Sequence, residues 1–311
     1  MVRSPLRVSA LLLNLCTSVP IYAKTQLNRR YHDPNSTARS LSTRIVGGDI
    51  ADATRFPYYT YLIMDTDNGP YRCGGTLIHP DIVMTAAHCH QELIHSGLEI
   101  LAITAWVNMT SISKTRTGYE HRRVVVQHLV HPAFDDLTNA NDVALFKLNQ
   151  EVSTVPLPRL AQRGRKPRVG VRVKAIGQGL MSESGMFPSE LQVVGINIVS
   201  YRDCNDWDSY NGAVDPVTML CAGAKEGGKD ACSGDSGGPL VRQMEFPEDD
   251  VIIGITSWGS GCGRAEKFGV YTKVSSFIAF IQRGICEMSS HALLSCLNDL
   301  PVSSTVAAPP I

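Results

Sequence analysis

The feature that most constrains the fold of this chain is a succession of short apolar runs, rich in β-branched residues and separated by turn residues. Runs of this length and composition predict β-strands. They occupy residues 58–64, 76–78, 82–84, 124–126, 143–148, 171–176, 193–199 and 251–256. Helical spacing of apolar residues is clear only late in the chain, at Val274, Phe277, Ile278 and Ile281. Many short strands and one late helix predict an all-β sandwich or barrel.

Composition and charge narrow the range of partners. The 311 residues carry 29 basic and 29 acidic side chains, so the formal net charge is zero. A chain without a positive field is poorly suited to phosphate binding, and we expect no nucleic-acid partner. No apolar run approaches the roughly 18 residues that a membrane-spanning helix needs, so we expect no membrane partner.

The two ends differ in character from the middle of the chain. Basic residues precede a short apolar stretch, Val8 to Cys16, and a less apolar segment then ends at Ala23. This pattern predicts a secretory signal peptide over residues 1–23, with a buried N-terminal helix as the alternative. Residues 24–44 are polar and poor in aliphatic side chains, as is typical of an exposed, weakly structured segment. Residues 286–311 are interpreted as a polar C-terminal extension.

Nine cysteines occur, at positions 16, 73, 89, 204, 221, 232, 262, 286 and 296. Loss of the signal peptide would remove Cys16 and leave eight in a chain bound for an oxidising compartment, which predicts disulfides. Zinc is the alternative, because histidines flank Cys89, but no Cys-x-x-Cys pair or His-Glu-x-x-His helix accompanies them. We expect no metal and no cofactor. The triplets at Asn35 and Asn108 are candidate glycosylation sites.

One serine stands in a run of glycines, Gly-Asp-Ser-Gly-Gly-Pro at residues 234–239. Glycines allow the backbone and a substrate to approach Ser236 closely, and neighbouring N–H groups can point at a developing oxyanion. A nucleophilic serine needs a base, and the base needs an orienting carboxylate. His88, in the run Thr-Ala-Ala-His-Cys, and Asp142, at the start of an apolar strand, supply these groups. Each residue alone would be interpreted as structural, but the three together indicate nucleophilic catalysis.

Four motifs in order resemble those of the trypsin-like (chymotrypsin) family of serine proteases. They are Ile-Val-Gly-Gly at 45–48, the histidine segment 85–89, the aspartate segment 141–145 and the serine segment 234–239. The order His, Asp, Ser is that of this family and differs from the order in subtilisins and α/β-hydrolases. The resemblance covers residues 45–285. It implies two six-stranded antiparallel β-barrels, at about 45–155 and 156–273, with the active site in the cleft between them and a helix at about 274–285.

The resemblance also implies a role for each matching residue. Ser236 would attack the scissile carbonyl, His88 would take its proton and pass it to the leaving amine, and Asp142 would hold the imidazole. The backbone N–H groups of Gly234 and Ser236 would form the oxyanion hole. The segment Ser257-Trp258-Gly259 would pair with the substrate backbone as an added β-strand.

Substrate specificity would follow from Asp230, which matches the position at the base of the family's primary specificity pocket. A carboxylate there would pair with a substrate Arg or Lys, most favourably with the two-pronged guanidinium of Arg. Gly259 and Gly269 match positions that line the pocket, and two glycines would leave it open to a long side chain. The alternative is a solvated charge in the loop 225–229.

Arg44-Ile45 matches the family's activation junction, so residues 24–44 would be an activation propeptide. Cleavage there would free an α-amino group on Ile45 that pairs with Asp235 and organises the oxyanion hole. Because Arg44 suits a pocket with Asp230 at its base, we hypothesise that the mature enzyme activates its own precursor. The family's disulfides map onto Cys73–Cys89, Cys204–Cys221 and Cys232–Cys262, and Cys286 and Cys296 would pair within the tail.

Three segments depart from the family's pattern. Gln178 stands where the family commonly has Trp, which predicts an altered rim of the site. Residues 105–118, where some trypsins carry a calcium loop, have no acidic cluster, so we expect no calcium site there. Residues 245–250 form a longer, acidic hairpin tip, which we interpret as a solvated loop.

Together these observations predict a secreted endopeptidase, made as a zymogen, that cleaves proteins or peptides after Arg or Lys through an acyl-enzyme intermediate. A non-catalytic binding protein on the same scaffold is one alternative, but the three catalytic residue types are all present. An esterase is another, since residues 234–238 fit the pattern Gly-x-Ser-x-Gly, but the chain order and the β-rich flanks argue against it. We expect protein protease inhibitors as further partners, and a monomer.

Overall fold

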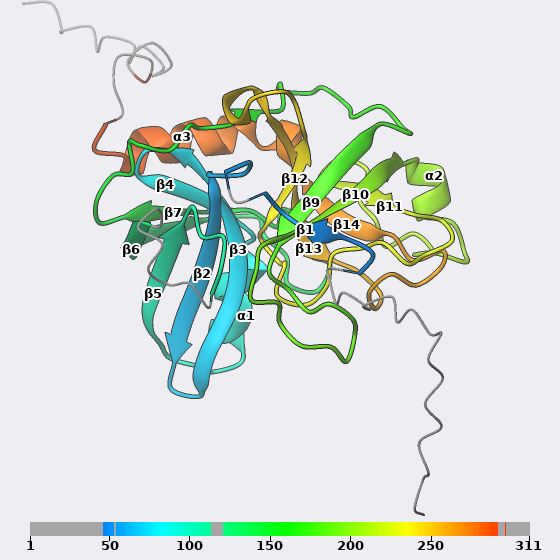
Figure 1. The fold of residues 1–311 in the computed structure, drawn as a ribbon, viewed down its shortest axis with the longest axis horizontal. Helices are drawn as coiled ribbons and strands as arrows, with labels where there is room; N and C mark the ends of the chain where they lie inside the picture. The colour runs from blue at the N-terminus through cyan, green and yellow to red at the C-terminus, as the bar shows by residue number, and fades with distance from the viewer. Residues whose placement is uncertain (1–45, 53, 113–120, 292–295, 297–311) are drawn as a thin grey trace, which may run out of the picture. The chain divides into compact units, whose positions relative to one another are not determined.

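The computed structural model describes residues 46–52, 54–112, 121–291 and 296 (Figure 1). Two closed six-stranded antiparallel β-barrels and a C-terminal helix make up these residues, which confirms the predicted fold class. The predicted signal peptide, the segment 24–44 and the junction Arg44-Ile45 lie outside the described residues. Within the described part of the chain, no helix is long and apolar enough to cross a membrane.

The first barrel closes in the strand order β2-β3-β4-β7-β6-β5. Its strands are β2 (Tyr59–Thr66), β3 (Gly69–His79), β4 (Ile82–Thr85), β5 (Ile100–Val107), β6 (His121–Val130) and β7 (Ala144–Leu148). Helix α1 (His88–His95) follows β4 directly. Strands β4 and β7 pair with each other and are buried along their whole length, so the segments that precede α1 and Asp142 are held together at the barrel wall.

The second barrel closes in the order β10-β11-β14-β13-β12-β9, with β9 and β10 paired to complete the ring. Its strands are β9 (Arg172–Gly177), β10 (Gln192–Val199), β11 (Met219–Gly223), β12 (Pro239–Arg242), β13 (Val251–Trp258) and β14 (Gly269–Lys273). Two short strands extend this sheet: β1 (Asp49–Ile50) pairs with β10, and β8 (Arg159–Leu160) lies parallel to β13. The helical segments are α2 (Tyr201–Cys204), η1 (Pro247–Asp249), η2 (Val274–Ser276) and α3 (Ile278–Met288).

Helix α1 is an element that the apolar pattern does not predict. It has eight residues, too few for a clear helical period, and Ala87, the residue before its first turn, supplies no side-chain cap. Long-range contacts hold it instead, because the Cys73–Cys89 disulfide joins its first turn to β3. The late apolar spacing that starts at Val274 is divided between the 3₁₀ turn η2 and helix α3.

An apolar layer joins the two barrels. The core of the first barrel continues into the second through buried side chains of β9, β12 and β13, and into the C-terminal helix. The members from these elements are Ile176, Val241, Ile252, Ile255, Ile281 and Met288. The second barrel has a separate inner core that includes Val173, Ile198 and Ile253. The shared layer brings the loops before β7, before β12 and after β13 to the junction of the barrels.

The acidic hairpin tip differs from its interpretation as a solvated loop. Asp250, its last residue, is fully buried and accepts hydrogen bonds from both terminal nitrogens of Arg55 at 2.7 Å. The Tyr58 hydroxyl and the Met244 N–H also donate to this carboxylate, at 2.5 and 2.7 Å. The interpretation was wrong for Asp250 because an arginine 195 residues away neutralises its charge in the fold.

We predict that Asp250→Ala lowers the free energy of unfolding by about 3 kcal/mol or more, because the partly buried guanidinium of Arg55 loses its counter-charge. Denaturant unfolding followed by tryptophan fluorescence would measure the change. The neighbouring Asp249→Ala is the matched control, since it removes only the half-exposed pair with Arg159 and should cost less than about 1 kcal/mol. Equal losses in the two variants would contradict the prediction.

Candidate active site

His88 is the first residue of α1 and lies at the junction of the barrels. The small side chains of Ala86 and Ala87 are fully buried, which lets the start of the helix pack against the segment before β7. There the backbone N–H of His88 donates to Asp142 Oδ1 at 2.9 Å, and its ring Nδ1 lies 2.8 Å from Asp142 Oδ2. The imidazole is therefore held in orientation by one carboxylate.

Asp142 is fully buried and collects donors from both barrels. The hydroxyl of Ser257, in β13, donates to Asp142 Oδ2 at 2.5 Å, in addition to the two contacts from His88. Burial alone would raise the pKa of Asp142, but the charge and hydrogen bonds of His88, with the Ser257 hydroxyl, outweigh it and lower the pKa. Burial likewise acts to lower the pKa of His88, but the Asp142 charge reverses this and raises it.

Ser236 lies in a tight turn before β12. Gly234 and Gly237 on either side have φ angles of 94° and 78°, in the left-handed region that favours glycine. The Ser236 carbonyl accepts from the N–H of Gly74 at 2.7 Å, so β3 of the first barrel fixes the turn. Ser236 and His88 line one cavity of about 380 Å³, although no hydrogen bond joins their side chains in this structure.

Two backbone N–H groups of this turn form a candidate anion site. Among the described residues, neither the Gly234 N–H nor the Ser236 N–H has an acceptor. A Cβ on Gly234 would lie 2.7 Å from the ring of Phe187, so the position has no room for a side chain. Preorganised, unpaired donors beside a serine are the arrangement that stabilises an oxyanion.

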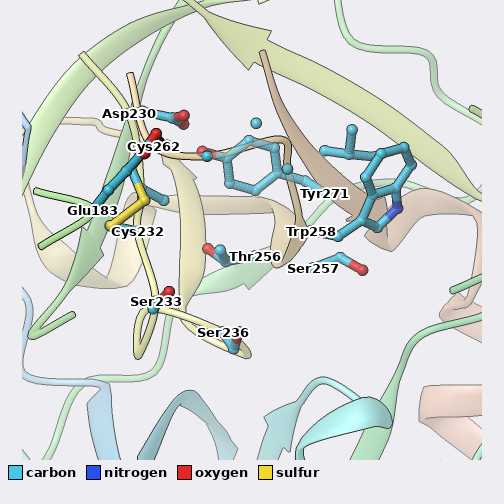
Figure 2. Close-up of a pocket in the computed structure, with 15 residues that line it drawn as sticks. Glu183, Asp230, Cys232, Ser233, Ser236, Thr256, Ser257, Trp258, Cys262 and Tyr271 are labelled. Atoms are coloured by element: carbon cyan, nitrogen blue, oxygen red, sulfur yellow. Dashed lines mark hydrogen bonds between the residues drawn. A yellow bond between two sulfur atoms is a disulfide. The ribbon is translucent and has the colours of Figure 1, made fainter. Parts of the chain in front are cut away.

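A pocket of about 340 Å³ opens beside Ser236, with Asp230 and Ser236 at opposite ends of its lining (Figure 2). Asp230 is 4% exposed; its Oδ2 accepts from the Gly263 N–H at 3.0 Å, and its Oδ1 has no partner among the described residues. Burial raises the pKa of Asp230 to about 7, although the Gly263 and Ala231 N–H groups act against it. Because Asp230 is buried, it is not the solvated loop charge of the alternative interpretation, and it has no cationic partner among the described residues.

The predicted glycines and the substrate-strand segment all line this pocket. A Cβ on Gly269 would lie 2.9 Å from Asp230 Oδ1, whereas a Cβ on Gly259 would meet nothing closer than 3.7 Å. Glycine at 269 thus keeps the base of the pocket accessible. The Cys232–Cys262 disulfide and the ring of Trp258 form parts of the wall (Figure 2).

Glu183 is a pocket residue that the sequence patterns did not identify. Its carboxylate accepts from the Cys262 N–H at 2.9 Å and from Arg264 Nε and Nη2 at 2.6 and 2.8 Å. The Arg264 guanidinium, followed by the Cys262 N–H, lowers the pKa of Glu183 to about 2. The loop that contains Glu183 is therefore fastened to the pocket wall by an ion pair, a contact that no local motif signals.

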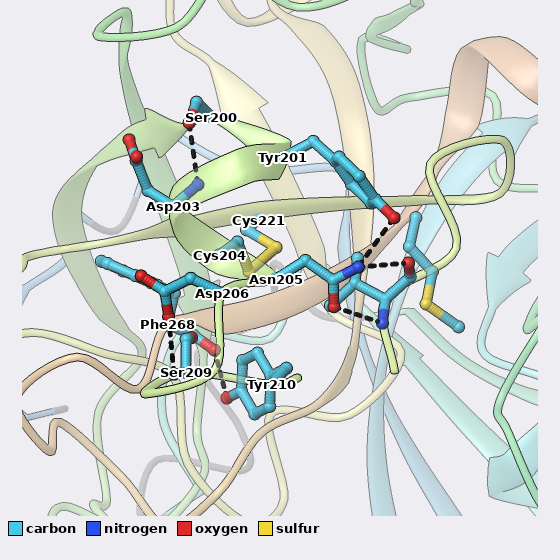
Figure 3. Close-up of a disulfide and its surroundings, with 12 residues drawn as sticks. Ser200, Tyr201, Asp203, Cys204, Asn205, Asp206, Ser209, Tyr210, Cys221 and Phe268 are labelled. Atoms are coloured by element: carbon cyan, nitrogen blue, oxygen red, sulfur yellow. Dashed lines mark hydrogen bonds between the residues drawn. A yellow bond between two sulfur atoms is a disulfide. The ribbon is translucent and has the colours of Figure 1, made fainter. Parts of the chain in front are cut away.

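Tyr210 supports the other wall. Its hydroxyl donates to the Phe268 carbonyl at 2.6 Å (Figure 3) and accepts from the Ser260 N–H at 3.1 Å. Its ring meets Trp258 edge to face, with 4.8 Å between the ring centroids. The loop that carries Tyr210 begins at the Cys204–Cys221 disulfide (Figure 3), so this disulfide stabilises the pocket from behind.

Asp235, next to the serine, is a second buried carboxylate with neutral partners. Its oxygens accept from the N–H groups of Gly179 and Cys232 at 2.7 and 2.8 Å. Burial raises the pKa of Asp235 to about 6, against the effect of these two donors. Ile45, the predicted partner, lies outside the described residues, but Val46 is described and its carbonyl accepts from the Asp230 N–H at 3.2 Å.

The remaining predicted residues fall into four groups. The structure contains the four disulfides Cys73–Cys89, Cys204–Cys221, Cys232–Cys262 and Cys286–Cys296. The sulfurs of Cys73 and Cys89 lie close to His88, but their disulfide leaves no thiolate for zinc. Gln178 is 1% exposed, and the altered rim expected from Gln at this position stays a prediction. Asn108 lies directly after β5, and Asn35 lies outside the described residues.

Comparison with known proteins identifies the class. The family model of trypsin matches residues 45–281. Trypsin delta of Drosophila erecta is 32% identical over 252 residues, which cover 80% of this chain and 92% of that protein. The vitellin-degrading protease of Bombyx mori is 36% identical over 248 residues, or 79% of this chain and 87% of that protein. The chain belongs to the trypsin family of serine endopeptidases, which confirms the resemblance read from the four motifs.

A longer relative shows the limits of the match. Coagulation factor XII of Bos taurus is 36% identical over 251 residues, which cover 77% of this chain but only 39% of that protein. The chain therefore spans less than half the length of this relative. What the two share is the region that contains the protease fold.

We predict that the pKa of the His88 imidazole lies above its ordinary value and falls below it in Asp142→Asn. The substitution removes the charge that raises this pKa and leaves the burial that lowers it. NMR titration of the imidazole would measure both values in a Ser236→Ala background. Asp135→Asn, an exposed carboxylate in the same segment, is the control and should leave the titration unchanged. A His88 pKa that is the same with and without Asp142 would rule the coupling out.

Proposed function

We propose that this protein is a secreted endopeptidase that cleaves peptide bonds after Arg or Lys. One observation carries the proposal: the buried carboxylate of Asp230, which has no cationic partner in the described part of the chain, lies at the end of a cavity that opens at Ser236. That serine shares a second cavity with an imidazole bound to a buried aspartate. Family membership supplies the class of reaction, and the pocket supplies the specificity.

The proposed reaction begins with attack of Ser236 Oγ on the scissile carbonyl. His88 Nε2 accepts the hydroxyl proton as Oγ bonds to the carbonyl carbon, and Asp142 stabilises the imidazolium that results. The N–H groups of Gly234 and Ser236 hydrogen-bond the oxyanion. Collapse of the tetrahedral intermediate expels the amine, which takes the proton from His88. Water then hydrolyses the acyl-enzyme by the same steps, with His88 as the base.

Binding would use both the pocket and the backbone beside it. The substrate main chain would add to the segment 257–259 as an extended strand, while its Arg or Lys side chain enters the pocket toward Asp230. A guanidinium or ammonium there would meet the unpaired Oδ1 and restore ionisation of a carboxylate whose pKa burial has raised. Arg would be favoured, because its fork can engage both oxygens.

We expect Asp230→Asn to lower kcat/KM on an Arg-containing peptide amide by roughly a hundredfold or more, with little loss on a matched Phe amide, because the buried cation would lose its counter-charge. Asp208→Asn, an exposed carboxylate in the same barrel, is the control. Steady-state kinetics on the two amides measures both effects. The Asp208→Asn control should have the kcat/KM values of the wild type. A wild-type enzyme that prefers the Phe amide would refute the role proposed for Asp230.

The titration of Asp230 gives an independent readout. Because the protonated carboxyl is neutral, a small guanidinium compound should bind the Ser236→Ala protein more tightly as the pH rises through about 7. Asp230→Asn should bind weakly at every pH. Calorimetric titration at several pH values measures the affinity of both proteins, and the difference between them separates the titration of Asp230 from that of His88.

Activation is proposed to proceed by cleavage between Arg44 and Ile45. The buried Asp235 carboxylate has only neutral N–H donors among the described residues, so a new α-amino group would complete its neutralisation. The Val46 carbonyl accepts from the Asp230 N–H, and this contact between the residue after Ile45 and Asp230 supports the proposal. Signal-peptide removal at residue 23 and secretion complete the proposed maturation, in keeping with four disulfides.

We predict that a Ser236→Ala precursor is cut between Arg44 and Ile45 when it is incubated with a trace of active enzyme. N-terminal sequencing would identify Ile45 as the new first residue. A Ser236→Ala precursor that also carries Arg44→Gln is the control and should stay intact, because its junction lacks the cation for Asp230. Self-activation would be disproved by an Arg44 precursor that remains uncut after long incubation.

A further inference from the structure

A third cavity, of about 520 Å³, lies at the end of the second barrel, and its lining shares no residue with the two cavities at Ser236. The strand register places it. Its lining includes residues at the start of β9 and β13 and at the end of β10 and β12. These strand ends lie together, because β9 pairs with β10 and β12 pairs with β13. Ser236 precedes β12 and Ser257 lies near the end of β13, so the cavity is at the opposite end of the barrel from the active site.

The floor of this cavity is aliphatic. Val173, Ile198 and Ile253 belong to the inner core of the barrel, and Val171 and Val251 are half-buried against it. The segment between β8 and β9 lines the cavity at one side. Val171 and Val251 supply the part of the floor that solvent reaches, because Val173, Ile198 and Ile253 are buried. When an apolar group of a ligand covers such a surface, the free energy of the complex is lowered.

The rim of the cavity is cationic. Five exposed basic side chains line it, Arg159, Arg165, Lys166, Arg168 and Arg242, and no acidic side chain does. Arg159 is paired with Asp249 at 2.6 Å, but no ion pair to the other four is found within the described part of the chain. This cavity with its rim is called the basic groove below. In a chain of zero net charge, such a cluster is a local feature.

We propose that the basic groove binds an acidic segment of a partner protein that also carries apolar side chains. A ligand with several negative charges would complement the exposed cations of the rim, and apolar groups between those charges would cover the accessible valine side chains of the floor. A peptide in which acidic and aliphatic residues alternate provides both, because successive side chains of an extended chain point to opposite sides. The site is independent of the proposed cleavage specificity.

The lining distinguishes this ligand from other polyanions. Single-stranded nucleic acids are bound by stacking of bases on aromatic side chains, and no aromatic residue lines the groove. A sulfated polysaccharide would satisfy the cations but would leave the aliphatic floor without an apolar contact. The acidic peptide is the ligand that uses the whole surface.

The test is fluorescence anisotropy with a labelled peptide that alternates Glu and Leu, added to the full chain carrying Ser236→Ala. We expect saturable binding that weakens at high salt. Combined Arg168→Glu and Arg242→Glu should weaken it roughly tenfold or more, since charge reversal on two sides of the groove replaces attraction with repulsion. The matched control, Arg202→Glu with Arg283→Glu, makes the same charge change at exposed arginines outside the groove and should alter the affinity less than about twofold.

Four outcomes would overturn the proposal. The first is no binding of the Glu–Leu peptide, and the second is equal weakening in the groove and control variants. The third is equal affinity for a peptide that alternates Glu and Ser, which would remove the role of the floor. The fourth is tight binding of heparin or an oligonucleotide in place of the Glu–Leu peptide. Unchanged hydrolysis of a small amide by the groove variant with Ser236 restored would show that it is folded.

Discussion

The buried carboxylate of Asp142 is the interaction on which the arrangement of the site depends. Asp142 belongs to the first barrel, yet the Ser257 hydroxyl of β13 donates to its side chain and the Thr272 hydroxyl of β14 donates to its carbonyl at 2.6 Å. An isolated buried charge costs several kcal/mol, so these donors and His88 are needed to keep it ionised. The same bonds fix the two barrels against each other at the point where His88 lies. The bonds to Asp142 therefore orient the imidazole and join the two barrels at the same time.

Three aspartates at the cleft are almost equally buried, but their pKa values are shifted in different directions. The difference lies in their hydrogen-bonding and charged partners. Asp142 faces an imidazole, and its pKa is lowered. Over the residues that the structure describes, Asp230 and Asp235 accept only from backbone N–H groups. These donors do not offset burial, and the two pKa values rise to about 7 and about 6. A buried carboxylate that lacks a cation is a preformed site for one. Under the proposed function, the cation of a substrate side chain would neutralise the Asp230 carboxylate, and the new N-terminal ammonium would neutralise the Asp235 carboxylate.

The sequence predicts those parts of the molecule whose chemistry is local. The apolar runs at 171–176 and 193–199 become β9 and β10, because β-branched residues suit a buried strand wherever it pairs. The residues in short motifs, such as His88 and Ser236, lie at the cleft as predicted, because the neighbouring residues of a motif determine the local backbone conformation. Contacts between distant residues carry no such signal. Glu183 meets Arg264 across 81 residues, so only the closed barrel reveals that bond.

Net charge illustrates the same limit, because a sum over the chain says nothing about where the charges gather. The equal numbers of acidic and basic residues argue against a polyanion partner, yet the fold collects five cations around the basic groove.

The position of the groove also determines which partners could reach the cleft at the same time. From Val251 to Ser257, β13 rises about 3.3 Å per residue, or roughly 20 Å in all. A partner that occupied the groove and the cleft together would need at least about six extended residues between them. Such a partner would gain local concentration at the cleft without competing for the specificity pocket.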